Sequence, residues 1–465
     1  MPLILPGNVG SATASTTYDV ANSCRFNDGD SAYMTRAFDA TQTSTSTFTI
    51  SVWVKRGILG TRQSIFAAYD GSSEAGDDLE FETDDTLSYN GSGSSSSKLN
   101  TTSAVFRDPG AWYHIVVARN SGATGAANQV KIYVNGVLQT LGTNGGCDTS
   151  QFLKTGLNSR IGASQNGSAY YVDMYMAEFV AIDGQMLDHT SFGEFDSDSP
   201  TIWKPKDISG LTFGTNGFYL DFEDSGDLGD DESGNTNDFT ETNLAAADQA
   251  VDSPTNNFCT LNPLNAATSV KFTYSEGNTK ALSTGTWRGG SGTFGVSSGK
   301  WYWEVVGSGA STPSGVATAG YIASGSADQE HGYLGVATTE KSYTYHLNGK
   351  LYTVNTDGSQ ANTSYGDTYT TEVIGIALNL DDNELKFYKD NTVQNSGTAI
   401  SIASGFTYMP IFHVADSANV SFNFGGSSGF AITSAASDAD GYGNFEFAPP
   451  SGFFSLCTKN LAEYG

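Results

Sequence analysis

Three alternating carboxylates, Glu194, Asp196 and Asp198, come nearest in this sequence to a catalytic arrangement. Alternate residues of a β-strand point to the same side, so a strand here would direct all three into one cleft. Two carboxyl groups about 5–5.5 Å apart serve a retaining glycosidase as nucleophile and general acid. The set follows a predicted turn and precedes Pro200, however, which favours a solvated loop. We therefore expect these residues to be structural, with glycan hydrolysis as the alternative.

A second alternating set, Glu80, Glu82 and Asp84, is followed by Asp85-Thr86, a pair typical of a hairpin turn. We interpret this set as the solvated face of a strand. The sequence shows no phosphate-binding glycine loop before a helix and no nucleophile–base pair. The histidines lack the helical spacing of a metal pair; they are His114, His189, His331, His346 and His413. These features predict a protein that is not an enzyme.

Aspartates gather in stretches that we expect to be loops, and hard oxygen ligands in flexible loops suit Ca²⁺. None of these stretches has the spacing of an EF-hand loop, and loop aspartates more often form turns. We expect no required cofactor, with calcium as an optional ligand of Asp28, Asp30, Asp224, Asp227, Asp230 and Asp231.

Two pairs of tyrosines are candidate carbohydrate contacts, Tyr170 with Tyr171 and Tyr343 with Tyr345. An aromatic ring complements the C–H face of a sugar, and tyrosine suits adaptable recognition surfaces in general. Packing between neighbouring strands is the alternative for both pairs.

Charge excludes two classes of partner. The 465 residues carry a formal net charge of −28, from 50 acidic and 22 basic side chains. A field of this sign repels nucleic acid and anionic membrane surfaces, and no apolar run approaches the ~20 residues of a membrane-spanning helix. We therefore expect no nucleic acid partner and no membrane insertion. The widely spaced Cys24, Cys147, Cys259 and Cys457 predict buried free thiols rather than a disulfide framework or a zinc site.

Period-two alternation of apolar residues predicts β-strands along most of the chain. The clearest example is the hairpin Val373–Asp390, with turn residues at Asp381-Asp382-Asn383. A similar hairpin joins Trp112–Arg119 to Gln129–Val134, and Asn135-Gly136 then predicts a type I′ turn. We predict an all-β fold of two tandem antiparallel jelly-roll β-sandwiches.

Composition marks the predicted boundaries between these parts. Residues 1–17 form an N-terminal arm and residues 18–223 the first sandwich. Residues 224–265 are acidic and rich in Gly and Asn, which is typical of a connection between domains. Residues 266–429 form the second sandwich, and residues 430–465 form a C-terminal tail that we expect to serve as a docking segment.

The two halves resemble two known families. The second resembles the SPRY domain, a bent β-sandwich that binds partners through loops, in the segments Ser298–Val306, Tyr333–Thr338, Val373–Asn391 and Tyr408–Gly425. The first is similar to laminin-G and concanavalin A-like lectin domains in Phe48–Arg56, Ala111–Arg119, Lys131–Val137 and Tyr175–Gln185. Some concanavalin A-like domains bind Ca²⁺ near a sugar, and some glucanases of this fold carry alternating carboxylates.

The combination also resembles virion structural proteins of marine tailed bacteriophages, often fibre-like. The matching segments include MPLILPGNVGSATA at the N-terminus, RFNDGDSAYMTRAF at Arg25–Phe38, DSPTNNF at Asp252–Phe258 and PPSGFFSLCTKNL at Pro449–Leu461. The resemblance implies a non-enzymatic protein on the virion surface, assembled in the host cytoplasm, as a tail fibre or receptor-binding protein for a host-surface glycan. Its partners would be other virion proteins, the host receptor and further copies of itself, as a trimer. The alternatives are a head fibre or capsid decoration protein, and a jelly-roll glycan hydrolase or depolymerase.

Overall fold

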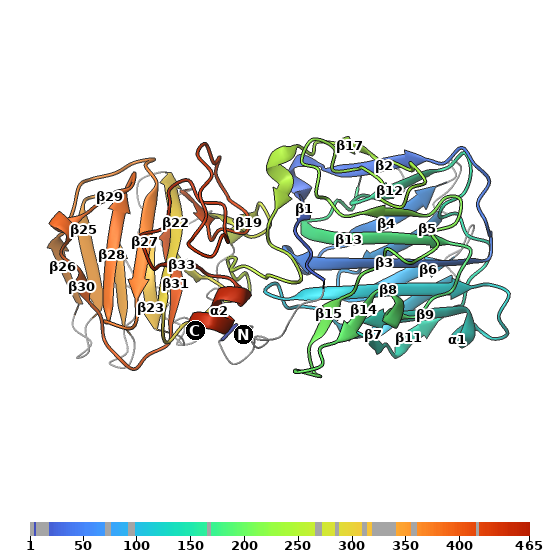
Figure 1. Ribbon diagram of the computed structural model, residues 1–465, viewed down its shortest axis with the longest axis horizontal. Coiled ribbons are helices and arrows are strands. Elements are labelled where there is room, and N and C mark those ends of the chain that lie inside the picture. The colour runs from blue at the N-terminus through green and yellow to red at the C-terminus, as the bar shows by residue number, and fades with distance from the viewer. Residues whose placement is uncertain are drawn as a thin grey trace. The chain divides into compact units, whose positions relative to one another are not determined.

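The computed structural model describes residues 4–5, 18–69, 76–91, 98–164, 169–265, 272–283, 288–308, 314–318, 341–354, 360–414 and 418–465. The chain forms two compact units (Figure 1). We call Ala14–Thr255 the first sandwich; the second sandwich combines Met1–Thr13 with Asn256–Gly465. The first sandwich is therefore inserted into the sequence of the second.

Two eight-stranded antiparallel sheets make up the first sandwich. The β3 sheet has the order β10 (Val137–Leu138), β9 (Val130–Val134), β8 (Trp112–Asn120), β3 (Thr47–Arg56), β13 (Met174–Asp183), β1 (Ser23–Phe26) and β18 (Gln249–Ala250), with β16 (Phe218–Leu220) also on β13. The β5 sheet has the order β11 (Leu141–Asn144), β7 (Leu99–Val105), β6 (Thr86–Gly91), β5 (Gly76–Phe81), β4 (Gln63–Tyr69), β12 (Asn158–Ile161), β2 (Tyr33–Ala37) and β17 (Thr240–Thr242).

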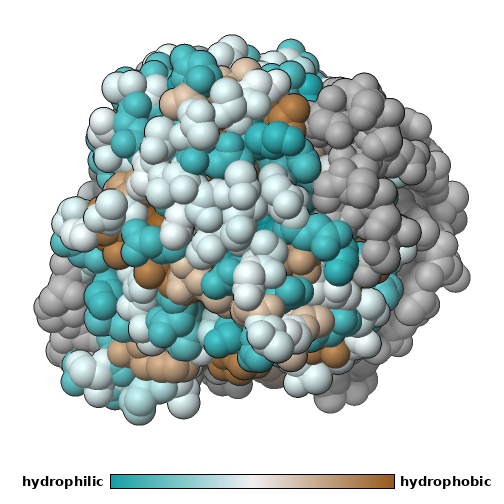
Figure 2. All heavy atoms as spheres, turned by 90° about the vertical axis from the view of Figure 1, so that its right-hand side faces the viewer, coloured by the Kyte–Doolittle hydropathy of each residue, from teal (hydrophilic) through white to brown (hydrophobic). Residues whose placement is uncertain are grey.

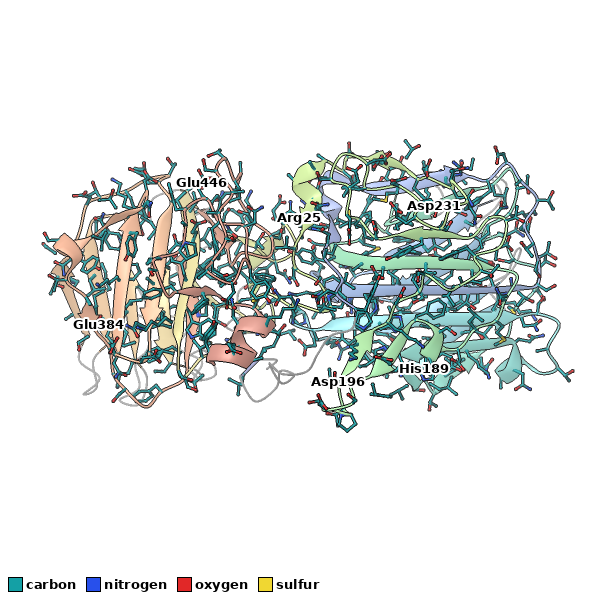
Figure 3. The ribbon with its side chains drawn as sticks, viewed as in Figure 1. Arg25, His189, Asp196, Asp231, Glu384 and Glu446 are labelled. Carbon is teal, nitrogen blue, oxygen red and sulfur yellow. The ribbon has the colours of Figure 1, made fainter. Side chains whose placement is uncertain are left out.

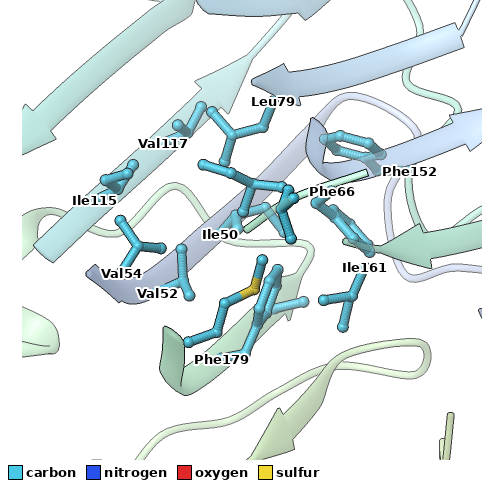
Figure 4. Packing of buried hydrophobic residues seen from close by; sticks show 14 of the residues in the cluster. Ile50, Val52, Val54, Phe66, Leu79, Ile115, Val117, Phe152, Ile161 and Phe179 are labelled. Carbon is cyan, nitrogen blue, oxygen red and sulfur yellow. The ribbon is translucent and has the colours of Figure 1, made fainter. Parts of the chain in front are cut away.

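The core of the first sandwich lies between these sheets and follows the predicted alternation (Figure 4). Ile50, Val52 and Val54 alternate along β3 and meet Phe66 and Leu79 of the β5 sheet. At the end of β9, the backbone φ angles of Asn135 and Gly136 are 48° and 76°, as the predicted type I′ turn requires.

The outer face of the β3 sheet is apolar as well, and further chain segments cover it. One cluster there contains Trp53, Trp112 and Tyr175, and another contains Val116 and Val180. The covering segments include the hairpin of β14 (Gly193–Phe195) and β15 (Trp203–Pro205), which contributes the ring of Trp203. This layer explains why all ten residues of β13 are buried.

The acidic segment predicted as a connection belongs, up to Thr255, to the first sandwich. Within it, β17 pairs with β2, and β18 pairs with β1. Asp252 is fully buried, where Lys55 Nζ lies 2.6 Å from Oδ2 and Trp112 Nε1 donates to Oδ1 at 3.1 Å. The composition was misleading here because buried aspartates in this segment serve as hydrogen-bond acceptors rather than as solvated charges.

Two sheets also make up the second sandwich. The β22 sheet has the order β19 (Phe272–Ser275), β20 (Lys280–Ser283), β32 (Asn419–Asn423), β22 (Lys300–Ser308), β27 (Ile374–Asn379), β28 (Glu384–Lys389) and β29 (Thr392–Val393), with β30 (Ile400–Ser401) on β28 and β33 (Phe454–Ser455) on β22. The β31 sheet has the order β21 (Arg288–Ser291), β31 (Tyr408–Val414), β23 (Ser314–Thr318), β24 (Ser342–Tyr345), β25 (Lys350–Val354) and β26 (Gln360–Ser364). The predicted hairpin is present as β27 and β28, with Asn383 at φ 57° in its turn.

Both ends of the chain are part of the second sandwich. Ile4 donates its N–H to Thr293 O at 2.7 Å and accepts from Gly295 N at 2.9 Å. At the other end, β33 adds a parallel strand to β22. Ile4 and β33 thus join the second sandwich, and the docking role expected of residues 430–465 stays a prediction. Only two short α-helices lie in the described chain, α1 (Ala126–Gln129) and α2 (Thr458–Tyr464), and no described helix is long and apolar enough to cross a membrane.

A buried carboxylate attaches the C-terminal tail, residues 430–465, to the β22 sheet. Glu304 of β22 points away from the core and accepts the backbone N–H groups of Glu446 and Phe447, at 2.9 and 2.8 Å. Asn423 Nδ2 and the Tyr302 hydroxyl donate to the same carboxylate at 3.1 and 3.2 Å. Burial raises the pKa of Glu304 from 4.5 to about 7, although these four donors oppose the shift.

We predict that Asp252→Asn lowers the free energy of unfolding of the first sandwich by about 3–5 kcal/mol. The substitution leaves the Lys55 ammonium buried without its counter-charge. Urea denaturation followed by tryptophan fluorescence measures the change. Asp224→Asn, at an exposed turn in the same segment, is the control and should change the stability by less than about 0.5 kcal/mol. Equal effects of the two substitutions would contradict the anchoring role of Asp252.

We predict that Glu304→Gln weakens attachment of the tail by about 2 kcal/mol, because a glutamine NH₂ group would face a backbone donor. Since the pKa of Glu304 is raised on folding, its contribution to stability is fully present below pH 4.5 and is lost as the pH rises through about 7. Limited proteolysis within residues 430–450, followed from pH 5 to 8, measures both effects. Glu463→Gln, on an exposed carboxylate of α2, is the control, and the same cleavage rates in both variants would disprove the prediction.

Candidate functional site

Carboxylates and arginines meet tyrosines on the outer face of the β5 sheet. In β5, Leu79 and Phe81 enter the core, so Asp78 and Glu80 point to the opposite side. The sequence predicts a solvated face for Glu80, Glu82 and Asp84, and this expectation is wrong for Glu80, which is buried together with Asp78, whereas Asp84 is exposed. Burial raises the pKa of Asp78 well above its usual range, and the neighbouring Glu80 adds to the shift.

Strand register places acidic, small and basic residues in one row across this face. Asp78 of β5 is opposite Ala67 of β4, and Ala67 is opposite Arg160 of β12. Arg160 is in turn opposite Thr35 of β2. Neighbouring strands lie about 4.8 Å apart, so the backbones of Asp78 and Arg160 are about 10 Å apart, with only an alanine between them.

Tyr170 lies on an ion pair at the end of this row. Arg62 forms a bidentate pair with Glu80, with Nε–Oε2 and Nη2–Oε1 distances of 2.5 and 2.7 Å. The Arg62 guanidinium carbon lies 4.3 Å from the centroid of the Tyr170 ring, a cation–π distance. Tyr170 is 43% exposed and adopts a left-handed backbone with φ 54°. Burial raises the pKa of Glu80, and the hydrogen bonds from Arg62 oppose that shift.

A second tyrosine pair lies close by. The ring centroids of Tyr171 and Tyr33 are 6.3 Å apart, and both side chains are half-buried. Arg160 lies within electrostatic reach of both phenols, and burial lowers the pKa of its guanidinium. We call Tyr33, Arg62, Asp78, Glu80, Arg160, Tyr170 and Tyr171 the Tyr170 face. It presents aromatic rings beside guanidinium groups, while its two carboxylates are buried and engaged by Arg62 and Ser64.

The prediction for the other tyrosine pair is wrong. Tyr343 is 5% exposed and Tyr345 is fully buried, both in the core of the second sandwich. The ring of Tyr345 packs against Tyr365, Tyr369 and Phe387. Its hydroxyl donates to Asp367 O. The alternative of packing between strands is therefore correct for this pair.

The structure does not assemble the predicted calcium ligands. Among the described residues, no group of three or more acidic, histidine or cysteine side chains is arranged to hold a metal ion. Asp231 instead accepts the backbone N–H groups of Tyr219, Ser233 and Asn237. Asp224 caps a turn by accepting from Gly226 N, and Asp227 and Asp230 lie in the same turns. Asp28 and Asp30 form a short 3-10 turn in which Asn27 Nδ2 donates to Asp30.

The alternating carboxylates at Glu194 lie on the β14–β15 hairpin. Figure 3 shows Asp196 at this hairpin, well apart from Asp231. Lys204 lies 3.6 Å from Glu194 and 3.1 Å from Asp196, and Asp196 also accepts the N–H groups of Asp198 and Ser199. The N–H group of Ser199 and the Lys204 ammonium lower the pKa of Asp196, and this carboxylate accepts the backbone N–H groups of the turn.

His114 is a satisfied histidine within the sheet. Its Nδ1 accepts from Trp203 Nε1 at 2.9 Å, so Nε2 donates to Ser51 Oγ at 2.8 Å. The ring stacks on Trp53 with centroids 4.6 Å apart. Burial lowers its pKa to about 3, which keeps the imidazole neutral. All four cysteines are buried and none forms a disulfide.

Sequence reasoning missed Glu178, a strained carboxylate inside β13. The register of β13 against β3 shifts between Ala177 and Val180, and Glu178 at φ 50° lies in this bulge. Its carboxylate accepts the hydroxyls of Tyr18 and Tyr219, at 2.7 and 2.9 Å. Burial raises its pKa to about 7. A lone glutamate in the apolar run YMAEFVAID was the available signal.

We predict that loss of the aromatic ring lowers the stability of the protein slightly at Tyr170 and strongly at Tyr345. Tyr170→Ala removes an exposed ring and should lower the free energy of unfolding by less than about 1 kcal/mol. Tyr345→Ala leaves a cavity in an aromatic core and should cost about 3–5 kcal/mol. Urea denaturation of both variants tests this. A Tyr170→Ala variant as unstable as Tyr345→Ala would mean that Tyr170 is structural.

Comparison with solved structures finds distant similarity. The SPRY domain of human HERC1 is 14% identical, covers 35% of this chain and 96% of its own, and has a TM-score of 0.27. A heptameric SAP-like pentraxin from Limulus polyphemus is 15% identical, with 37% and 80% covered and a TM-score of 0.30. A Bacteroides ovatus protein named for carbohydrate binding is 15% identical, with 50% and 62% covered and a TM-score of 0.33. None of the curated protein sequences compared with the chain matches it.

Comparison with family models identifies both halves. Residues 27–187 match the concanavalin A-like lectin/glucanases superfamily in its laminin-G form, and residues 300–427 match the SPRY domain. The first match includes β2 to β13, and with them all seven residues of the Tyr170 face. The chain thus contains a concanavalin A-like lectin domain followed by a SPRY domain, in the order predicted from the sequence.

Proposed function

We propose that this protein is a non-enzymatic adhesion protein that binds a glycan through the Tyr170 face. The observation that carries the proposal is the exposed Tyr170 ring on the Arg62–Glu80 ion pair. The guanidinium occupies one side of the ring, so the other side is available for the C–H face of a sugar. Lectin-like and SPRY folds together support a binding role.

Binding fits the Tyr170 face better than catalysis does. Arg62 engages both oxygens of Glu80, and Ser64 Oγ donates to Asp78 at 2.6 Å. A carboxylate in a bidentate ion pair is a poor nucleophile, because the attack would have to break that pair. Arg62 and Glu80 instead hold Tyr170 in position, which lowers the entropy that the ring loses on binding a ligand.

The place of action that we propose is the surface of a tailed-bacteriophage virion, as a tail fibre or receptor-binding protein. The sequence segments that resemble phage virion proteins support this source. The net charge of −28 favours a soluble, exposed component and disfavours contact with packaged nucleic acid. The partners would be other virion proteins, the host glycan and further copies of the chain, with a trimer expected for a fibre.

We predict that the purified full chain adsorbs saturably to host cells, and that Tyr170→Ala weakens adsorption about 10-fold. Loss of one stacked ring typically corresponds to about 1–1.5 kcal/mol, which gives a factor of this size. Phe195→Ala is the control, because Phe195 is 46% exposed and lies on the β14–β15 hairpin. Titration of fluorescently labelled protein on cells measures all three affinities.

Two results would overturn the proposal. Equal adsorption by wild type and Tyr170→Ala would remove the Tyr170 face from recognition. Release of reducing sugar from host polysaccharide that disappears in Glu194→Gln would show an enzyme. Immunogold labelling of intact particles separates a tail position from a head position, where the protein would be a head fibre or decoration protein.

A further inference from the structure

The interior of the first sandwich contains an arginine where its strand pattern calls for an apolar residue. Ile115 and Val117 of β8 point into the core, and Arg119 continues the same alternation. Its side chain is fully buried, with the guanidinium carbon 5.3 Å from the centroid of the Phe48 ring. None of its three side-chain nitrogens makes a well-aligned hydrogen bond with the described residues, although the Cys147 sulfur lies close enough to interact with the guanidinium. A guanidinium carries five N–H donors, so the described protein groups leave most of its hydrogen-bonding capacity unused.

Two further polar atoms without a well-aligned hydrogen bond face the same region from the opposite sheet. Asp77 of β5 and Tyr89 of β6 are fully buried, and Asp77 Oδ1 and Tyr89 Oη make no well-aligned hydrogen bond in the described structure, although the Tyr89 hydroxyl lies near the Asp77 carboxylate. Asp77, Tyr89 and Arg119 lie within electrostatic reach of one another, and Cys147 lies beside them. Asp77 Oδ2, in contrast, accepts from Ser150 Oγ and from the backbone N–H of Gln151 at 3.1 Å.

We propose that Asp77, Tyr89 and Arg119 enclose ordered water molecules that bridge them as a water-separated ion pair. Buried polar groups in folded proteins are almost always hydrogen-bonded, and those without a protein partner are bonded to water. Roughly two or three molecules are required, because each water accepts about two of the five guanidinium hydrogens.

Charge balance identifies water rather than an ion as the occupant. Burial raises the pKa of Asp77, and the Arg119 charge and the donors of Ser150–Phe152 oppose that rise; with both groups ionised, a bound anion would leave an uncompensated negative charge in a low-dielectric interior. A cation would be opposed by the guanidinium. Water can accept from Arg119 while it donates to Asp77 Oδ1, and a monatomic ion cannot do both. The surrounding rings of Phe48 and Phe152, 5.5 Å apart, are apolar and strengthen these hydrogen bonds.

The water site has a structural consequence. Asp77 holds the segment Ser150–Phe152, and Phe152 packs on Tyr89 with ring centroids 6.1 Å apart. The bridged pair therefore connects β8 of one sheet to β5 and β6 of the other through the interior of the sandwich. This arrangement fixes the distance between the sheets by hydrogen bonds, in addition to apolar packing.

A crystal structure of the full chain at about 1.5 Å, with a second crystal grown in sodium bromide, tests the proposal. We expect density peaks within hydrogen-bonding distance of the Arg119 nitrogens and Asp77 Oδ1, without an anomalous bromide signal. A direct Asp77–Arg119 contact with no density between the groups would overturn the proposal, and so would a bromide peak at the site.

Tyr89→Phe provides a second test that preserves the ring packing. We expect this variant to lose the water beside the missing hydroxyl, to keep those on Arg119, and to melt about 2–4 °C lower. Tyr113→Phe is the control, since the Tyr113 hydroxyl has a protein partner in Asp108 N at 2.9 Å. An unchanged melting temperature and unchanged density in Tyr89→Phe would contradict the bridging role.

Discussion

Sheets with apolar residues on both faces explain much of the chain outside the sandwiches proper, and the β3 and β22 sheets show this constraint clearly. A second sheet is enough to bury the apolar face of a sheet that has only one. A sheet with two apolar faces needs a further layer of chain on its outer side. In the β3 sheet, Trp53 and Trp112 point away from the core. In the β22 sheet, Tyr302 and Ala377 do the same. The segments that look like loops and tails in the sequence supply the missing layers.

Buried carboxylates hold these outer layers in place. Asp252 binds Lys55 and Trp112, and Glu304 accepts four donors, two of them from the backbone of the tail. An irregular segment has backbone N–H groups that no strand pairs, and a carboxylate can satisfy several of them at once. Apolar contact alone would bring such a segment to the sheet without fixing its register. The acidic composition of the chain is thus partly internal structure, in addition to surface charge.

Local patterns in the sequence predicted the strands, both hairpins and the order of the two domains. Alternation is a property of a few neighbouring residues, and the Asn135-Gly136 turn requires only the freedom of those two residues. The same alternation could not tell which face of a strand is covered, because that depends on segments far away in the sequence. Tyr345 and Glu80 are both buried for this reason. Composition likewise failed for residues 224–255, where the hydrogen bonds of Asp231 and the buried Asp252–Lys55 ion pair hold the segment in the first sandwich.

The candidate site likewise combines a residue that the local sequence identifies with contacts to segments far away in the sequence. Tyr170 was identifiable as an aromatic residue near polar ones, but the sequence could not show that Arg62 and Glu80 lie beneath its ring. That contact needs β4 and β5 in register, and the chain near residue 170 fixed beside them; Ser64 N donates to Tyr170 O at 2.9 Å. The left-handed backbone of Tyr170 costs of order 1 kcal/mol and directs the ring onto the ion pair. A strained residue with an exposed aromatic ring on a fixed charge pair is better explained by recognition than by stability, because burial of the ring would have stabilised the fold more.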